Sequence, residues 1–150
     1  MANIEIRLAT SSDLDFVQQD GFIPTEVVKR KIAWQEIFVA CRKNVPVGYL
    51  RLEYLWSLVP YIALIRVLPE HHRQGAGKAL LHFIEEFLRS RGHSVLYSSS
   101  QANEQEPQAW HRHMGFEECG IISGINAGGV GEVFFRKQLK GGANNVRPEN

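Results

Sequence analysis

The chain has little cysteine and no long apolar run, and each absence excludes a class of protein. Two cysteines among 150 residues, Cys41 and Cys119, are too few for a disulfide-stapled scaffold and lack the spacing of a zinc site. The most apolar stretch, 54–67, is interrupted by serine, proline and arginine, so it cannot supply a membrane helix of about 20 residues. The first residues lack the basic segment and apolar run of a signal peptide, and we therefore expect a cytoplasmic protein.

The chain also has no large excess of positive or negative charge. Seventeen lysines and arginines stand against 16 aspartates and glutamates, which gives a formal net charge of +1. This balance argues against binding to nucleic acid or to an anionic membrane through the overall field. With 44% hydrophobic residues, a chain of this length buries the core of one ordinary domain. We expect one domain over 1–140 and a disordered tail over 141–150, where no apolar pattern exists.

Hydrophobic periodicity predicts a mixed α/β domain. Apolar patterns predict strands at 4–8, 37–41, 48–56, 61–68, 94–98, 116–122 and 131–139. Helical spacing predicts helices near 14–17, 25–33, 77–91 and 107–114, with Thr25 as the cap of the second. We expect a turn at 44–48 and burial of the strand at 61–68 on both faces. The predicted order is β-α-α-β-β-β-α-β-α-β-β, in which a central strand leads directly into the long helix.

The junction between that strand and that helix carries the strongest chemical signal. A helix start presents unpaired N–H groups and partial positive charge, and glycines let a phosphate approach its backbone closely. The P-loop pattern fails, because His72 stands at its first glycine and Ala79 at its Ser/Thr position. The dinucleotide pattern fails at Leu80, where a third glycine is needed. The alternative is that Gly75 and Gly77 merely form a tight turn.

Two segments resemble motifs of the GNAT superfamily of acyl-CoA-dependent N-acyltransferases. The first is His72-Arg73-Gln74-Gly75-Ala76-Gly77, placed after a strand that ends in Val67-Leu68-Pro69. His72 departs from the arginine or glutamine that the family usually has there. The second is Asn103 followed by the 110–116 segment Trp-His-Arg-His-Met-Gly-Phe, which is similar to the family's Asn and aromatic-Tyr-x-x-Leu-Gly-Phe segment.

The resemblance implies a fold, a co-substrate and a reaction. It implies a central mixed, mostly antiparallel sheet flanked by helices, and transfer of the acetyl group of acetyl-CoA to a primary amine by direct attack in a ternary complex. No metal is expected. The cofactor-binding residues that it implies are Val67, Leu68, His72, Arg73, Gln74, Gly75, Ala76, Gly77, Lys78 and Asn103. A catalytically weak CoA-binding or sensor module is the alternative, followed by a nucleotide- or phosphate-binding protein of another class.

His111 takes the position of the family's tyrosine, which often protonates the leaving CoA thiolate. A phenol has a pKa of about 10 and always has a proton to offer at pH 7, whereas imidazole has a pKa of about 6.5. His111 acts as an acid only when charged, a form that Glu104 or Glu106 would favour. Neutral His111 would act as a base. In the remaining alternative, the imidazole simply forms hydrogen bonds in a helix.

Glu53 is the second candidate catalytic residue, because it interrupts a largely apolar run beside the central strand. It would accept a proton directly or through water; otherwise it is a solvated carboxylate or a partner for Arg51. Arg66 is unusual in a buried strand, and either lines the acceptor site or forms an ion pair.

Other residues bear on the acceptor amine, which the sequence does not identify. The aromatic residues Tyr54, Trp56 and Tyr61 either wall an acceptor pocket or pack in the core. The break at Phe22 and Ile23 falls where the family usually places its acceptor lid. The apolar closing strands would support a homodimer. A metal site at the four histidines His71, His72, His111 and His113 lacks cysteine or carboxylate spacing, and neither cysteine has a base partner that would make it a nucleophile.

Overall fold

The computed structural model describes residues 3–139. The predicted disordered tail over 141–150 lies outside the described residues. The chain divides into two compact units, which we call the first unit (Met1–Leu52 and Leu64–Ile84) and the second unit (Glu53–Ala63 and Glu85–Asn150). No helix within the described part of the chain is long and apolar enough to cross a membrane.

The strands and helices follow the predicted order. They are β1 (Ile4–Leu8), α1 (Leu14–Val17), α2 (Thr25–Ala33), β2 (Ile37–Arg42), β3 (Val45–Leu55), β4 (Val59–Val67), α3 (Ala76–Ser90), β5 (Val95–Gln101), α4 (Gln105–His113), β6 (Glu117–Ile122) and β7 (Glu132–Gln138). The hydrogen-bonded strand order is β1-β2-β3-β4-β5-β7-β6. Strands β4 and β5 run parallel, whereas the pairs β1–β2, β2–β3, β5–β7 and β6–β7 are antiparallel. The predicted mixed, mostly antiparallel sheet flanked by helices is confirmed.

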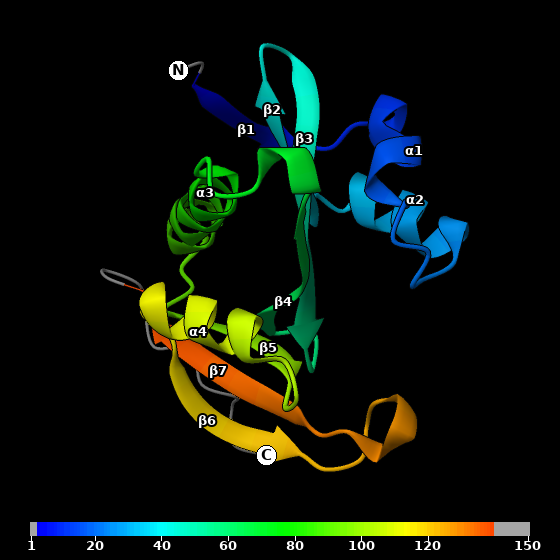
Figure 1. The fold of residues 1–150 in the computed structure, drawn as a ribbon. Helices are drawn as coiled ribbons and strands as arrows, with labels where there is room; N and C mark the ends of the chain where they lie inside the picture. The colour runs from blue at the N-terminus through cyan, green and yellow to red at the C-terminus, as the bar shows by residue number, and fades with distance from the viewer. Residues whose placement is uncertain (1–2, 140–150) are drawn as a thin grey trace. The chain divides into compact units, whose positions relative to one another are not determined.

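The first unit is built around β2, whose first five residues are all buried. Alternate side chains of β2 pack on opposite sides of the sheet, because successive residues of a strand point to opposite faces. Ile37 and Val39 belong to a cluster with Val17 of α1 and Val28 of α2, while the Phe38 ring lies 5.9 Å from that of Phe83 in α3. In Figure 1, α1 and α2 accordingly lie on one side of β1–β3 and the start of α3 on the other.

The second unit is organised by β5 and its antiparallel partner β7. Their register pairs Ser98 with Phe135 and Ser99 with Phe134, so the two serines face opposite sides of the sheet. Helix α4 runs along this sheet (Figure 1). Strand β6 is exposed at every residue, including Ile121 and Ile122. A homodimer through the closing strands stays a prediction.

Three local expectations are wrong. Thr25 does not cap α2: Pro24 is the N-cap residue, and the Thr25 hydroxyl donates to Oε1 of Gln18 at 2.8 Å. The turn predicted at 44–48 is shorter, because Lys43 and Asn44 take left-handed φ angles of 50° and 65° and β3 begins immediately after them. Of residues 61–68 only Ile62 is buried, so this strand is not enclosed on both faces.

Candidate active site

The junction between β4 and α3 lies in the first unit and has an open backbone. After β4, a 3-10 turn over Pro69–His71 leads to Gly75, which has a φ of 89°. The space beside Gly75 is open, because a Cβ added there would have no neighbouring atom within 4 Å. The Ala79 N–H donates to the Gly75 carbonyl at 2.9 Å, as the first turn of α3 requires. The amides that precede Ala79 have no carbonyl within the helix to bond, so they are directed at whatever lies before its start.

His72 closes this turn. Its Nε2 lies 2.7 Å from the carbonyl oxygen of Val67, the last residue of β4. Because a carbonyl only accepts, Nε2 carries the proton and donates it. The Leu68 N–H is also engaged, since it donates to the Val47 carbonyl at 2.9 Å. That bond argues against the Leu68 amide as a group that binds a ligand.

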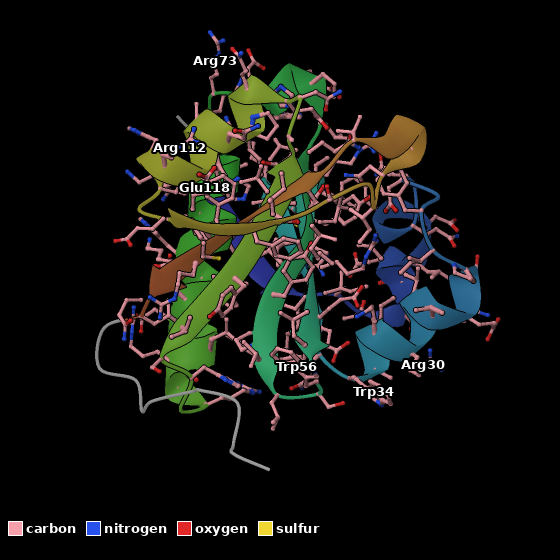
Figure 2. All side chains as sticks on the ribbon, turned by 90° about the horizontal axis from the view of Figure 1, so that it is seen from below. Arg30, Trp34, Trp56, Arg73, Arg112 and Glu118 are labelled. Carbon is pink, nitrogen blue, oxygen red and sulfur yellow. The ribbon has the colours of Figure 1, made fainter. Side chains whose placement is uncertain are left out.

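Three polar side chains surround the junction. Arg73 is exposed, and Figure 2 shows it extending away from the ribbon. Lys78 is exposed on the first turn of α3, and the Gln74 side chain donates to the Glu70 carbonyl at 3.4 Å. Two cations, a helix N-terminus and the open space beside Gly75 suit a pyrophosphate chemically. The residues present therefore fit the diphosphate of a CoA thioester.

Gly48 is a residue that sequence reasoning missed. An added Cβ there would lie 2.8 Å from the Arg66 carbonyl oxygen, a distance that side chains do not tolerate. Glycine at this position of β3 therefore allows a close backbone approach to the end of β4. A glycine inside a strand pattern is the signal that could have identified it. The Arg66 side chain itself is exposed.

A buried ion pair fixes the connection between α1 and α2. The Asp20 carboxylate accepts from Arg51 Nη1 and Nη2 at 3.1 and 3.2 Å and from the Tyr49 hydroxyl at 2.5 Å. The Arg51 and Asp20 side chains are only 3% and 1% exposed. Burial opposes ionisation of Asp20, but the bonds from Arg51 and Tyr49 outweigh it and lower the Asp20 pKa to about 2. The partner of Arg51 is thus Asp20, which the sequence did not indicate.

The predicted acceptor lid follows directly on this ion pair. The Phe22 N–H donates to Asp20 Oδ1 at 2.9 Å, while the Phe22 ring is 71% exposed. Ile23 packs against the core of the first unit. The loop is therefore anchored at its backbone and presents one free aromatic ring.

His111 lies in the second unit, on α4, and is 3% exposed. Its Nδ1 lies 2.7 Å from the Pro107 carbonyl oxygen and its Nε2 lies 2.7 Å from Ser98 Oγ. Because the carbonyl only accepts, Nδ1 carries the proton of the neutral ring and Nε2 accepts from the Ser98 hydroxyl. The ring also stacks on Phe135, with centroids 4.6 Å apart.

This environment argues against His111 as an acid. Burial lowers the pKa of His111 below its ordinary value and outweighs the opposing effects of the Pro107 carbonyl and the Glu132 charge. Glu104 and Glu106 are exposed and are not among the groups that shift it. His111, as a neutral ring with both nitrogens hydrogen-bonded, is better suited to act as a base or to hold the structure than to act as an acid.

The opposite face of this sheet holds a polar chain that sequence reasoning also missed. The Tyr61 hydroxyl lies 2.6 Å from Ser99 Oγ, which donates to Glu132 Oε2 at 2.5 Å. The Asn126 amide donates to the other Glu132 oxygen at 2.9 Å. Only Tyr61 of this group was named from the sequence, as a pocket or core aromatic.

The remaining candidates of the second unit are more exposed. Glu53 is exposed on β3, and its charge contributes to raising the pKa of Tyr61, so the carboxylate and the phenol are near one another. Asn103 lies in an exposed turn between β5 and α4. Tyr54 packs against His93 at 5.8 Å between ring centroids, and Trp56 is 61% exposed.

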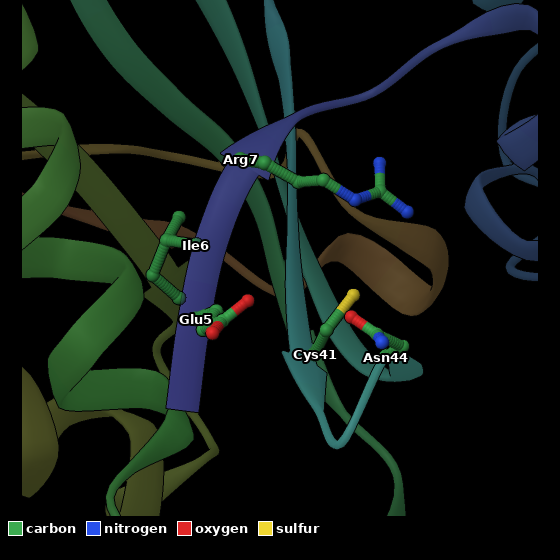
Figure 3. Close-up of a pocket in the computed structure, with 5 residues that line it drawn as sticks. All are labelled: Glu5, Ile6, Arg7, Cys41 and Asn44. Carbon is green, nitrogen blue, oxygen red and sulfur yellow. The ribbon is translucent and has the colours of Figure 1, made fainter. Parts of the chain in front are cut away.

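Residues 3–139 include the candidate metal ligands and both cysteines. No group of three or more potential ligands is close enough together to hold a metal ion there. Cys41 is buried and Cys119 is exposed, with the pKa of the Cys119 thiol raised by partial burial. A pocket of about 200 Å³ is lined by Glu5, Ile6, Arg7, Cys41 and Asn44 (Figure 3), none of which is a predicted site residue.

Solved structures show which fold this is. The chain is similar to Ard1 from Thermoplasma volcanium (TM-score 0.80, 14% identity, covering 91% of this chain and 97% of that one). It is also similar to the ribosomal-protein-S18-alanine N-acetyltransferase from Escherichia coli (TM-score 0.78, 17% identity, 97% and 100%). A third similar structure is the ribosomal-protein-alanine N-acetyltransferase from Brucella melitensis (TM-score 0.77, 23% identity, 90% and 99%).

Sequence comparison gives the family. Comparison with curated proteins gives no match, but the model of the acetyltransferase (GNAT) family matches residues 8–116, which include the β4–α3 junction and His111. Together with the observed sheet, this match settles the class of enzyme that the motifs at 72–77 and 110–116 indicated. The chain belongs to the acetyltransferase (GNAT) family and is an acyltransferase.

Proposed function

We propose that this acetyltransferase transfers the acetyl group of acetyl-CoA to a primary amine by direct attack in a ternary complex. The observation that carries the proposal is the β4–α3 junction, where a helix start, the open space at Gly75 and two exposed cations suit the diphosphate of CoA. Acetyl-CoA would supply the activated thioester carbonyl. The residues proposed to bind it are those at 67–68, 72–78 and Asn103, with Leu68 contributing through its side chain, because its amide is already bonded.

The chain's own residues must remove a proton from the acceptor. The lone pair of a neutral amine attacks the thioester carbon and the carbon–sulfur bond breaks, but a primary amine is largely protonated at pH 7. We propose that the exposed Glu53 carboxylate attracts this ammonium group. For His111 we propose a positioning role, in which the neutral ring holds Ser98 and α4 rather than donating a proton.

Ligand binding separates this proposal from a nucleotide-binding protein. A ligand that binds the native state raises its melting temperature, and we expect CoA to do so and ATP not to. Gly77→Leu, within the first turn of α3, should abolish the CoA shift because a side chain there obstructs the backbone. His82→Leu places the same side chain on an exposed position of the same helix and should keep the shift. Stabilisation by ATP alone would refute the proposal.

Turnover separates the enzyme from a silent CoA-binding module. The assay is release of the CoA thiol from acetyl-CoA with three acceptors: n-propylamine, a lysine-containing peptide with a blocked N-terminus, and a peptide with a free N-terminal alanine. The last is included because two similar structures are named for ribosomal-protein alanine. We expect amine-dependent release with at least one acceptor. If CoA binds but no CoA thiol is released with any acceptor, the protein is a CoA-binding module and not an active enzyme. The cytoplasmic location and the homodimer remain predictions.

A further inference from the structure

Three side chains from three strands of the second unit form an unbroken hydrogen-bonded chain. Tyr61 of β4 contacts Ser99 of β5 at 2.6 Å, and Ser99 contacts Glu132 of β7 at 2.5 Å. Both distances are at the short end of the range for O–H···O bonds. The adjacent Ser100 has a buried hydroxyl without any such partner among the described residues, so the arrangement belongs to Ser99 in particular.

The chemistry of the three groups fixes the direction of the bonds. An ionised carboxylate only accepts, so Ser99 donates its single proton to Glu132. The Ser99 oxygen must then accept from Tyr61, which donates its own proton. Every proton of the chain therefore points toward Glu132, and the lone pairs of the Tyr61 oxygen remain available to a donor from outside.

The chain is held in place at both ends. The Tyr61 ring stacks on Phe134 with centroids 5.7 Å apart, and Phe134 is the register partner of Ser99. At the other end, the Asn126 amide donates to Glu132 Oε1 and leaves Oε2 to Ser99. Groups fixed by neighbours in this way need little reorganisation before a proton moves.

The charges around Tyr61 suit a cationic ligand. Burial raises the pKa of Tyr61, and the charges of Glu132 and Glu53 raise it further. Tyr61 therefore stays protonated near neutral pH. It cannot hold a second proton, but it can accept one from a donor while it passes its own to Ser99. Two carboxylates near one phenol attract an ammonium group.

We propose that Tyr61, Ser99 and Glu132 form a relay through which the acceptor ammonium loses its proton before attacking the thioester. An N–H bond of the ammonium breaks as a new Tyr61 O–H forms, the former Tyr61 proton passes to Ser99 Oγ, and the former Ser99 proton passes to Glu132 Oε2. The ammonium becomes a neutral amine with a free lone pair and the Glu132 carboxylate becomes a carboxylic acid, so charge and protons balance. The inference rests on the proposed function and assigns the proton path of the same reaction.

The test is a set of single variants assayed with the acceptor that the wild-type enzyme uses. Tyr61→Phe, Ser99→Ala and Glu132→Gln should each lower kcat about 100-fold at pH 7, with KM for acetyl-CoA unchanged, because positioned acid–base groups contribute about 10²–10⁴-fold. Ser100→Ala in β5 and Glu117→Gln in β6 change residues outside the relay and should retain the wild-type kcat. Ser99→Thr keeps the hydroxyl and should restore most of the rate.

A pH profile separates a relay from a structural network. In Glu132→Gln, the loss of kcat should shrink as pH rises toward the pKa of the acceptor amine, because a neutral amine no longer needs a base. Loss of folding would lower kcat at every pH and would appear in the thermal melting curve. Wild-type kcat values in Tyr61→Phe and Glu132→Gln would overturn the relay while leaving the acetyltransferase proposal intact.

A second measurement does not need turnover. In protein labelled with carbon-13 at glutamate carboxyls, the Glu132 signal is assigned by its loss in Glu132→Gln. Addition of n-propylamine should shift this signal in the direction of protonation, and Tyr61→Phe should abolish the shift. No shift in the wild-type protein would overturn the relay. Absence of acetyl transfer with all acceptors would instead overturn the proposed function, and the two failures are therefore distinguishable.

Discussion

Two neighbouring serines of β5 have the same side chain and opposite surroundings. Ser98 donates to a neutral imidazole, that of His111, which is 3% exposed and stacked on Phe135. Ser99 donates to the Glu132 carboxylate on the other face of the sheet, and its other partner, Tyr61, is half-buried. One hydroxyl is buried against an imidazole, while the other connects a phenol to a negative charge.

The difference shows that the partner determines what a hydroxyl can do. A buried neutral histidine with a lowered pKa binds a further proton only at low pH, so its bond to Ser98 mainly holds α4 to the sheet. A carboxylate can take up a proton and lose its charge in doing so. We therefore expect changes on the Ser98 face to affect stability and changes on the Ser99 face to affect the rate.

The largest expected effect lies on the Ser99 face. The double variant Ser99→Ala/Glu132→Gln should lower kcat by about 100-fold, no more than either single variant, because residues that act as one unit are strongly non-additive. Steady-state kinetics at pH 7 measures this. A loss near 10⁴-fold, the product of the two single effects, would show that the residues act independently.

On the Ser98 face, His111→Phe should lower the free energy of unfolding by about 1–3 kcal/mol, because the buried Ser98 hydroxyl would lose its hydrogen-bond partner. The ring stacking on Phe135 can persist. Urea unfolding measures the change, and the pH profile of kcat should keep its shape. Loss of one limb of that profile would show that His111 takes part in proton transfer during the reaction.

The pH dependence of stability should distinguish the same two faces. Because burial lowers the His111 pKa, the unfolded chain takes up a proton near pH 6.5 that the folded chain takes up only at lower pH. His111 therefore makes the folded state lose stability as pH falls below about 6.5. His93, whose pKa is also lowered by burial, contributes in the same sense. Unfolding measured between pH 7 and 5 should show a weaker decline in His111→Phe than in the wild type, and an unchanged decline would contradict its burial.

The smallest expected effect concerns the Tyr61 pKa. Glu132→Gln should lower it, because the charge of Glu132 raises it. Ultraviolet titration of tyrosinate in this variant, compared with Ser100→Ala, measures the difference. Identical titration curves would show that Tyr61 and Glu132 are not coupled.

Most of the fold could be predicted because its signals are local. Within residues 3–139, the period of the apolar residues located the seven strands and the four α-helices. Glycine correctly marked the ends of α3 and α4 at Gly92 and Gly115, which have φ angles of 86° and 92°. The errors were also local. Pro24 supplied the helix cap that Thr25 was expected to supply, and Asn44 adopted a left-handed conformation that shortened the turn.

The site was less predictable because its contacts depend on strand register. Ser99 and Glu132 are 33 positions apart and meet only through the pairing of β5 with β7. Asp20 and Arg51 are 31 positions apart and gave no pattern that would link them. Motif spacing located His111, but its burial and its bonded nitrogens depend on the packing of α4, which a single sequence does not encode.

The His72 side chain has a consequence for the thermodynamics of ligand binding. Its bond to the Val67 carbonyl ties the loop before α3 back to the strand that precedes it. A loop restrained in this way loses its conformational entropy when the protein folds, and little remains to be lost when a ligand arrives. We therefore expect the entropic cost of ordering this loop to fall on folding and not on ligand binding.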